Sequence, residues 1–211
     1  MPDEPKVWIV DSDAGAWDSP RRLLRSLGIA TTTYVSAEEF LQAHNESDSG
    51  CVLTELLLPS MNGLELLETL FRSPLRPAAI VVTAHAEIAT TVRSLQLGAL
   101  TLLEKPCNEL LLLDVVRDAL KIDQSRRAMS VRRTTAIAAI DSLTPQERQV
   151  MDLMMSGLSN KAMAKKLDVS IRTIESRRQR VFRKLNAKSL PELVAIVVEA
   201  KECTEKGYGK R

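Results

Sequence analysis

The sequence predicts an α/β domain with a doubly wound, five-stranded parallel sheet, followed by an all-α domain that contains a helix-turn-helix. Toward the N-terminus short apolar runs alternate with amphipathic helical patterns, and toward the C-terminus two such helical patterns meet at a short turn. The charges divide as well: residues 1–123 carry 10 Lys and Arg against 18 Asp and Glu, and residues 124–211 carry 19 against 9. Because cations bind phosphate, we expect the second part to bind nucleic acid.

Four of the five expected strands are continuous apolar runs, and a weaker strand precedes Tyr34. The four runs are Val7 to Val10, Val52 to Thr54, Ile80 to Thr83 and Leu100 to Leu103. Such runs are typical of strands that are buried on both faces of a parallel sheet.

Helical patterns separate these strands and supply the faces that cover the sheet. Their apolar residues are Leu23, Leu24 and Leu27 before Gly28; Phe40 and Leu41; Leu64, Leu66, Leu67 and Leu70; Val92 and Leu95 before Gly98; and Leu110 to Leu120. A repeated strand–helix alternation predicts a doubly wound sheet, whose site lies at the carboxyl ends of the strands.

The residues at those strand ends are the first candidate site. They are Asp11, Ser12 and Asp13 after the first strand, Glu55 after the third, Thr83 at the fourth, and Lys105 followed by Pro106 after the fifth.

The helix-turn-helix pattern occupies residues 159–185. Its first helix has an apolar stripe, and Ser170 is a suitable N-cap for the second helix. The apolar residues are Ala162, Met163, Ala164 and Leu167 in the first helix and Ile171, Ile174, Val181 and Leu185 in the second. The opposite side of the second helix carries Arg172, Thr173, Ser176, Gln179, Arg180 and Arg183. We expect this side to enter a major groove; the alternative is a solvated basic surface.

Residues 122–140 connect the two parts and contain little Gly or Pro, which favours a helical linker. Arg126, Arg127, Arg132 and Arg133 lie in this stretch. They form either a solvated helix face, which we favour, or an auxiliary phosphate contact.

Neither an enzyme nor an exported protein is indicated. The sequence has no Walker A loop, GxSxG, GxGxxG or zinc motif, so we expect no enzyme. Cys51, Cys107 and Cys203 are far apart, as expected of reduced thiols. At the N-terminus acids precede an apolar run of only four residues, so we expect neither a signal peptide nor a membrane span, and a cytoplasmic protein without membrane contact.

The last third of the chain contains LTPQER, GLSNK, IRTIESRR and KLNAKSLPEL in this order. Together these motifs resemble the four-helix DNA-binding domain of LuxR/NarL/FixJ-type bacterial regulators. The resemblance implies double-stranded DNA as a partner. It places Glu175, Ser176 and Gln179 near base edges, and Asn160, Lys161, Arg172, Thr173, Arg177 and Arg180 on phosphates.

The resemblance also implies a homodimer formed through the last helix. In that helix Leu190, Leu193, Val194, Val197 and Val198 are spaced as one apolar stripe. The alternative is that the whole stripe packs on the helix of Val150, Leu153 and Met154.

Residues 5–122 contain VDSD, TELLLPSMNG, VVTAH and LLEKP, which resemble the receiver domain of two-component response regulators. The resemblance implies a phosphoryl-accepting aspartate at the third strand and paired acids after the first strand that hold Mg²⁺. It also implies a Thr and a Lys that contact the phosphoryl oxygens, and a cis Lys-Pro bond.

Three residues depart from that pattern. Glu55 stands at the phosphoacceptor position, and its longer side chain is expected to reach toward Thr83 and Lys105. Ser12 replaces the second metal-binding acid, so Mg²⁺ binding should be weak or absent. Leu102 stands where an aromatic switch residue is usual.

These departures favour a transcription regulator that acts independently of phosphorylation. The alternative is a conventional regulator that a histidine kinase phosphorylates, and a weaker one is an antagonist that titrates another regulator. We expect a receiver-like domain at 1–122, a helical linker at 123–140, a LuxR-type domain at 141–205 and a disordered tail at 206–211.

Overall fold

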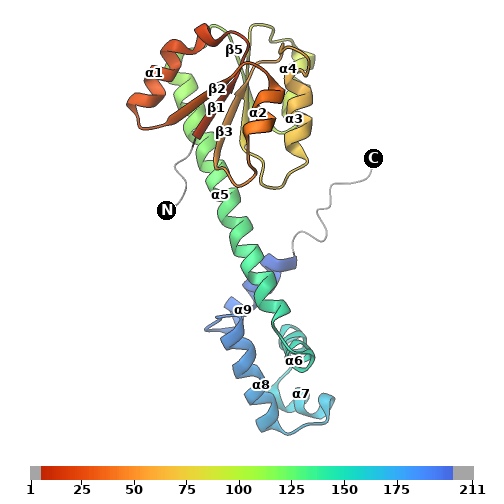
Figure 1. The fold of residues 1–211 in the computed structure, drawn as a ribbon. Coiled ribbons are helices and arrows are strands. Elements are labelled where there is room, and N and C mark those ends of the chain that lie inside the picture. The colour runs from red at the N-terminus through yellow and green to blue at the C-terminus, as the bar shows by residue number, and fades with distance from the viewer. Residues whose placement is uncertain (1–5, 202–211) are drawn as a thin grey trace. The chain divides into compact units, whose positions relative to one another are not determined.

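The computed structural model describes residues 6–201, so the expected tail and the last residues of the expected LuxR-type domain lie outside it. The chain forms two compact units that divide between Ala128 and Met129. This division falls inside helix α5 (Glu109–Asp141) (Figure 1). The stretch between the expected domains is therefore helical throughout.

The first unit contains the predicted five-stranded parallel sheet, in the order β2-β1-β3-β4-β5. The strands are β1 (Lys6–Val10), β2 (Ala30–Tyr34), β3 (Gly50–Thr54), β4 (Ala78–Thr83) and β5 (Ala99–Glu104). Every residue of β3 and β4 is buried, which explains their continuous apolar sequence. Strand β2 is an edge strand and is partly exposed, so its sequence is mixed and its signal weak.

Helices cover both faces of this sheet (Figure 1). They are η1 (Ala14–Trp17), α1 (Asp18–Ser26), α2 (Ala37–Ala43), α3 (Gly63–Phe71), α4 (Ile88–Gln96) and α5. Leu24 of α1 and Leu112 of α5 pack into the core on one face. Phe40 of α2 and Leu66 of α3 pack into the core on the other.

Local sequence determines where several of these helices begin and end. Asn62 and Glu65 form a capping box at the start of α3, and Ser36 caps α2. Gly98 makes the turn from α4 into β5 with a φ of +87°, and a Cβ there would lie 2.3 Å from the Phe71 ring.

The second unit consists of the end of α5 followed by α6 (Pro145–Met155), α7 (Asn160–Leu167), α8 (Ile171–Lys184) and α9 (Leu190–Lys201). Its core contains Val150, Met163, Ile174, Val181 and Leu193. Thr144 and Glu147 form the capping box of α6, and Ser170 caps α8 through the backbone N–H of Thr173. The all-α domain with a helix-turn-helix is therefore confirmed.

Two details of the predicted apolar faces are wrong. Ala162 and Ile171 are exposed, because each projects to the side of the buried residues of its helix, Met163 and Ala164 in α7 and Ile174 and Val181 in α8. The stripe on α9 divides: Leu193 and Val197 are buried, whereas Leu190 is 40% and Val198 43% exposed. The alternative in which the whole stripe packs inward is therefore wrong.

The interpretation of Arg126 and Arg127 as a solvated face is also wrong. Both are partly buried and donate hydrogen bonds within the first unit, Arg126 to the carbonyl oxygen of Arg76. Arg127 reaches the carbonyl oxygens of Glu46 and Ser47 as well as the Asp123 carboxylate. The sequence pattern of α5 could not indicate these acceptors, because they lie on distant loops.

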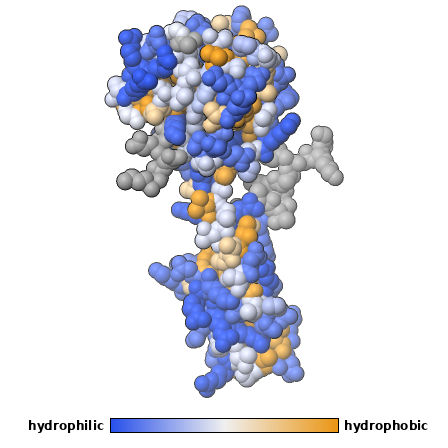
Figure 2. Space-filling view, in the orientation of Figure 1, coloured by the Kyte–Doolittle hydropathy of each residue, from blue (hydrophilic) through white to orange (hydrophobic). Residues whose placement is uncertain are grey.

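Polar residues make up much of the face drawn in Figure 2, in both units, with apolar patches between them. Among the described helices, none is long and apolar enough to span a membrane.

Candidate functional site

Three parallel strands bring Asp11, Glu55 and Lys105 together. Asp11 continues β1 and donates its N–H to the carbonyl of Tyr34, while Glu55 continues β3 and donates to that of Val10. Lys105 follows β5 and donates its N–H to the carbonyl of Thr83, at 2.8 Å. The carboxyl ends of these parallel strands therefore place all three side chains at one edge of the sheet.

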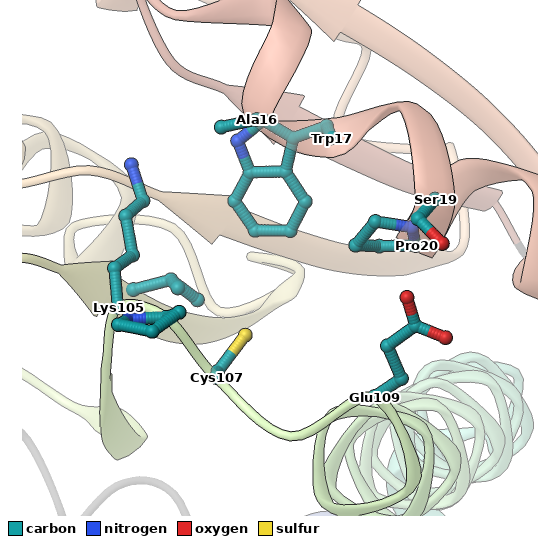
Figure 3. Close-up of a pocket in the computed structure, with 9 residues that line it drawn as sticks. Ala16, Trp17, Ser19, Pro20, Lys105, Cys107 and Glu109 are labelled. Atoms are coloured by element: carbon teal, nitrogen blue, oxygen red, sulfur yellow. The ribbon is translucent and has the colours of Figure 1, made fainter.

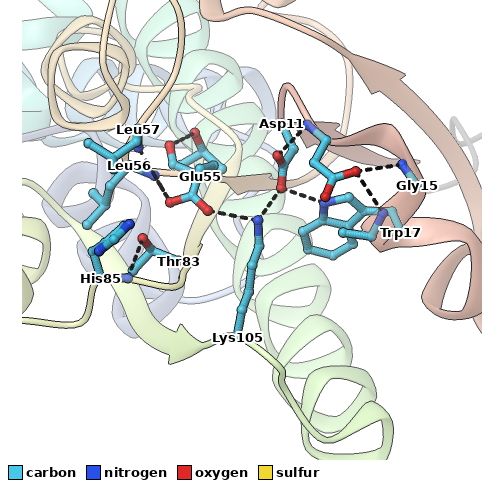
Figure 4. A network of polar contacts seen from close by, with 12 residues as sticks. Asp11, Gly15, Trp17, Glu55, Leu56, Leu57, Thr83, His85 and Lys105 are labelled. Carbon is cyan, nitrogen blue, oxygen red and sulfur yellow. Dashed lines mark hydrogen bonds and ion pairs between the residues drawn. The ribbon is translucent and has the colours of Figure 1, made fainter.

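The Lys105 ammonium lies between the two carboxylates (Figure 4). Its Nζ is 2.5 Å from Asp11 Oδ2 and 2.7 Å from Glu55 Oε2. Asp11 is 1% and Glu55 8% exposed, so both charges are largely removed from water. Burial by itself would lower the pKa of Lys105, but its hydrogen bonds to Asp11 and Glu55 outweigh burial and raise that pKa above the ordinary value.

Asp11 uses both of its carboxylate oxygens within the chain. Oδ1 accepts the backbone N–H of Asp13 at 2.9 Å, and Oδ2 accepts the indole N–H of Trp17 at 2.7 Å in addition to Lys105. Trp17 belongs to this site as well, although it is not among the residues predicted from the sequence. A buried tryptophan needs an acceptor for its N–H, and Asp11, six residues earlier, is that acceptor.

Glu55 turns back onto its own backbone as well as toward Lys105. Its Oε1 accepts the N–H of Leu56 at 2.7 Å and that of Leu57 at 3.4 Å. A Cβ on Gly63 would lie 2.3 Å from the Glu55 carbonyl oxygen, so the start of α3 packs directly on this backbone.

Of its two expected neighbours, Glu55 reaches Lys105 but does not hydrogen-bond to Thr83 within the described residues. Thr83 is buried, and its hydroxyl accepts the N–H of His85 at 3.1 Å. Because Oε1 accepts backbone N–H groups, only Oε2 of Glu55 is left for a side chain from another strand, and Lys105 donates to it.

The remaining predicted residues of this edge lie apart from Lys105. Ser12 is exposed, and the Asp13 carboxylate accepts the N–H groups of Gly15 and Ala16 at the start of η1. Leu102 packs against the core under α2 and α3. The Lys105–Pro106 bond is cis, as the receiver resemblance implied.

The donor set does not fit a magnesium ion in this arrangement. Mg²⁺ takes near-octahedral oxygen ligation and binds through one or two carboxylates. Here both oxygens of Asp11 accept hydrogen bonds, and Asp13 is used as a helix cap. Within residues 6–201 no group of three or more His, Cys, Asp and Glu could hold a metal ion.

The second site is the outer face of α8. Arg172, Glu175, Ser176, Gln179 and Arg180 are exposed there. A shallow depression along this face is lined by Ser170, Arg172, Thr173, Ser176, Arg177 and Arg180. Four of the five exposed residues carry hydrogen-bond donors, so this face can donate hydrogen bonds both to phosphate oxygens and to base edges.

Contacts to α6 and α7 hold α8 in place. The Arg178 guanidinium donates to Asn160 Oδ1 of α7 at 2.7 Å, and Lys161 beside it is exposed. Lys184 donates to Glu147 Oε2 of α6 at 2.7 Å. The hydrogen bond from Lys184 holds the pKa of Glu147 below its ordinary value. The predicted phosphate contact Asn160 therefore also has a partner inside the domain.

Two family models match the chain. Residues 7–117 match the response regulator receiver domain, and residues 141–197 match the luxR family of bacterial regulatory proteins.

Individual proteins are similar over nearly the whole chain. The transcriptional regulatory protein FixJ of Azorhizobium caulinodans is 36% identical over 95% of each chain. The C4-dicarboxylate transport transcriptional regulatory protein DctR of Rhodobacter capsulatus is 35% identical over 89% of this chain and 96% of its own. Among solved structures, the response regulator StyR aligns with a TM-score of 0.83 and 34% identity, covering 92% of this chain and 98% of StyR.

Proposed function

The chain belongs to the FixJ-type transcriptional response regulators, which join a receiver domain to a LuxR-type DNA-binding domain, and we propose that its receiver acts without phosphorylation. The observation that carries this proposal is the double ion pair of Lys105 with Asp11 and Glu55. The group that would contact an incoming phosphoryl group is already ion-paired with two carboxylates of the chain itself.

The hydrogen bonds around this ion pair support the proposal. Glu55 and Asp11 would each have to lose donors before one could accept a phosphoryl group and the other a metal ion. Ser12 offers no carboxylate in compensation. Glu55 thus places a permanent negative charge where a phosphorylated aspartate would carry a transient one.

DNA is the output partner of this regulator, and the proposed contacts follow the exposed face of α8. Glu175, Ser176 and Gln179 approach base edges. The proposed phosphate contacts are Asn160, Lys161, Arg172, Thr173, Arg177 and Arg180. Support comes from the exposure of Lys161, Arg172 and Arg180.

We further propose that DNA is bound by a homodimer, on an inverted repeat, through the outward stripe of α9. Leu190 and Val198 are exposed and Val194 is half-buried, so they form one apolar line at intervals of one helical turn. A second copy of the chain offers the same line, as an isologous interface requires.

The alternative is a conventional regulator that a histidine kinase phosphorylates. Asp11, Thr83 and Lys105 stand at the strand ends where a receiver needs them, which favours this alternative.

The test compares untreated protein with protein incubated with acetyl phosphate and Mg²⁺. Intact mass, oligomeric state and footprints on genomic fragments should all stay unchanged. Glu55→Asp alone should also remain unmodified, whereas Glu55→Asp combined with Ser12→Asp should bind Mg²⁺ and accept phosphate. With Leu102 unchanged, the double variant should alter its DNA affinity little, because a modification shifts an equilibrium only between available states.

The decisive contrary result is wild-type protein that gains a phosphoryl group and then binds DNA more tightly. The protein would then be a conventional regulator that phosphorylation activates.

A further inference from the structure

A cavity of about 440 Å³ lies in the receiver unit between the start of α1 and the segment that joins β5 to α5 (Figure 3). Its walls include Trp17, Pro20, Val82 and Pro106. Cavities of a few hundred Å³ with apolar and aromatic walls are the usual sites of small-molecule ligands.

The walls favour a flat, apolar molecule. The ring of Trp17 faces the cavity, while its N–H is directed to Asp11 (Figures 3 and 4). Two proline rings, from Pro20 and Pro106, provide further rigid apolar surface. Trp17 lines the cavity but is only 2% exposed, so an aromatic ring that entered would meet an edge of the Trp17 ring; edge-on packing is a favourable arrangement for ring pairs.

The charges at the cavity favour a cation. The Glu109 carboxylate points into it (Figure 3), and within residues 6–201 Glu109 has no ion pair. Lys105 also lines the cavity, but its charge is already balanced by Asp11 and Glu55. An anionic ligand would therefore meet an uncompensated carboxylate and no free cation.

The Cys107 thiol also points into the cavity and is neutral. Burial raises its pKa above the ordinary value, and the charge of Glu109 acts in the same direction. A protonated thiol is a small, weakly polar wall group, so Glu109 supplies the cavity's free charge.

We propose that this cavity binds a small aromatic amine, with its ring against Trp17 and its ammonium group at Glu109. Binding itself is independent of the phosphorylation question, whereas the role of the amine as the receiver's input rests on the proposed function. The ligand would touch Trp17 and the Lys105 side chain, both of which hydrogen-bond to Asp11. It could thereby favour one arrangement of the strand-end residues over another.

The test titrates the full-length chain with three probes of similar shape: 2-phenylethylamine, the neutral 2-phenylethanol and the anionic phenylacetate. Isothermal titration calorimetry measures binding to wild type. Quenching of Trp17 fluorescence reports the site in a Trp8→Phe variant, which removes the other of the two tryptophans. We expect the amine to bind about fivefold more tightly than the alcohol, the size of a partly exposed ion pair, and phenylacetate most weakly.

Two variants and one control localise the binding. Glu109→Gln should abolish the preference for the amine over the alcohol. Glu104→Gln removes an exposed carboxylate that does not line the cavity, and it should leave the preference intact. Cys107→Phe should fill the cavity and abolish binding of all three probes, and thermal unfolding would verify that this variant is folded.

Binding of the amine to Cys107→Phe as to wild type, or no binding of any probe to wild type, would overturn the site. Equal affinities for amine and alcohol would overturn the assigned ligand class. The acetyl phosphate experiment has a different readout, so failure of the proposed function would be seen separately.

Discussion

A single ammonium group, that of Lys105, is ion-paired with two carboxylates that follow different strands. Removing one partner of a buried ion pair commonly costs about 3–5 kcal/mol, because the other charge is left uncompensated. Asp11 and Glu55 are both nearly inaccessible to water, so each depends on Lys105 and on its backbone and indole donors. Changing Glu55 to Asp alone should still not create a working phosphoryl site, because Ser12 supplies no carboxylate for a metal ion.

Two neighbouring residues on α8 should contribute to DNA binding in different ways. Arg180→Ala should weaken binding to all sequences and reduce the salt slope by about one, because it removes a phosphate contact. Gln179→Ala should cost about 1–3 kcal/mol at its own base pair only. Fluorescence anisotropy with operator and random duplexes over a salt series measures both effects.

Arg72→Ala is the matched control for this comparison, since Arg72 is an exposed arginine of the receiver unit. Arg72→Ala should change neither the affinity for the duplexes nor the salt slope. Equal losses for Arg180→Ala and Gln179→Ala on specific and random DNA would contradict the assigned roles.

At the scale of elements, α5 is anchored to the amino end of the sheet. Asp123 is fully buried, and its Oδ2 accepts from Ser49 Oγ at 2.8 Å, from Gly50 N at 2.9 Å and from Arg127 Nε at 2.9 Å. Arg127 also donates to the carbonyl oxygens of Asp48 and Leu75. These contacts bind α5 to the loops that precede β3 and β4, at the opposite edge of the sheet from Lys105.

Arg127→Ala should therefore destabilise the first unit by about 3–5 kcal/mol, since it leaves the Asp123 charge buried without a cation. Chemical unfolding of the full-length chain, followed by a probe of the receiver such as tryptophan fluorescence, measures the loss. Arg132→Ala, an exposed position five residues further along α5, should change stability by less than about 0.5 kcal/mol.

A second change distinguishes the ion pair from simple loss of packing. Asp123→Asn in the Arg127→Ala background should recover part of the lost stability, because it removes the uncompensated charge. Similar stabilities for Arg127→Ala and Arg132→Ala would contradict the anchoring role.

At the scale of the whole molecule, each unit has its own hydrophobic core. The acidic residues gather before residue 124 and the basic residues after it, so receiver and DNA-binding roles belong to separate units. The proposed homodimer would use surfaces that neither core needs.

The outward and inward residues of α9 should respond differently to a charge. Val198→Glu should leave the unfolding temperature nearly unchanged but weaken binding to an inverted repeat and favour one protomer per duplex. Val197→Glu should unfold the second unit, because Val197 is 1% exposed and would bury an unpaired carboxylate. Thermal unfolding and analytical ultracentrifugation with DNA measure the two outcomes. A folded Val198→Glu protein with wild-type affinity for the repeat would contradict the α9 dimer.

The sequence by itself determined the two folds and the place of both candidate sites. Strands buried on two faces must be continuously apolar, as β3 and β4 are, and parallel strands must end at one edge, which brings Asp11, Glu55 and Lys105 together. The helical period likewise separates the core face of α8 from its polar face.

Only the tertiary structure decided which partners these side chains have. Trp17 donates to an oxygen of Asp11, Glu55 turns to Lys105 and not to Thr83, and Arg127 bonds to loops about 50 to 80 residues away. The stripe of α9 divides because the core of the second unit has room for only part of it. Periodicity reports which face of an element is apolar, whereas hydrogen bonds between distant segments depend on where the packed elements finally lie.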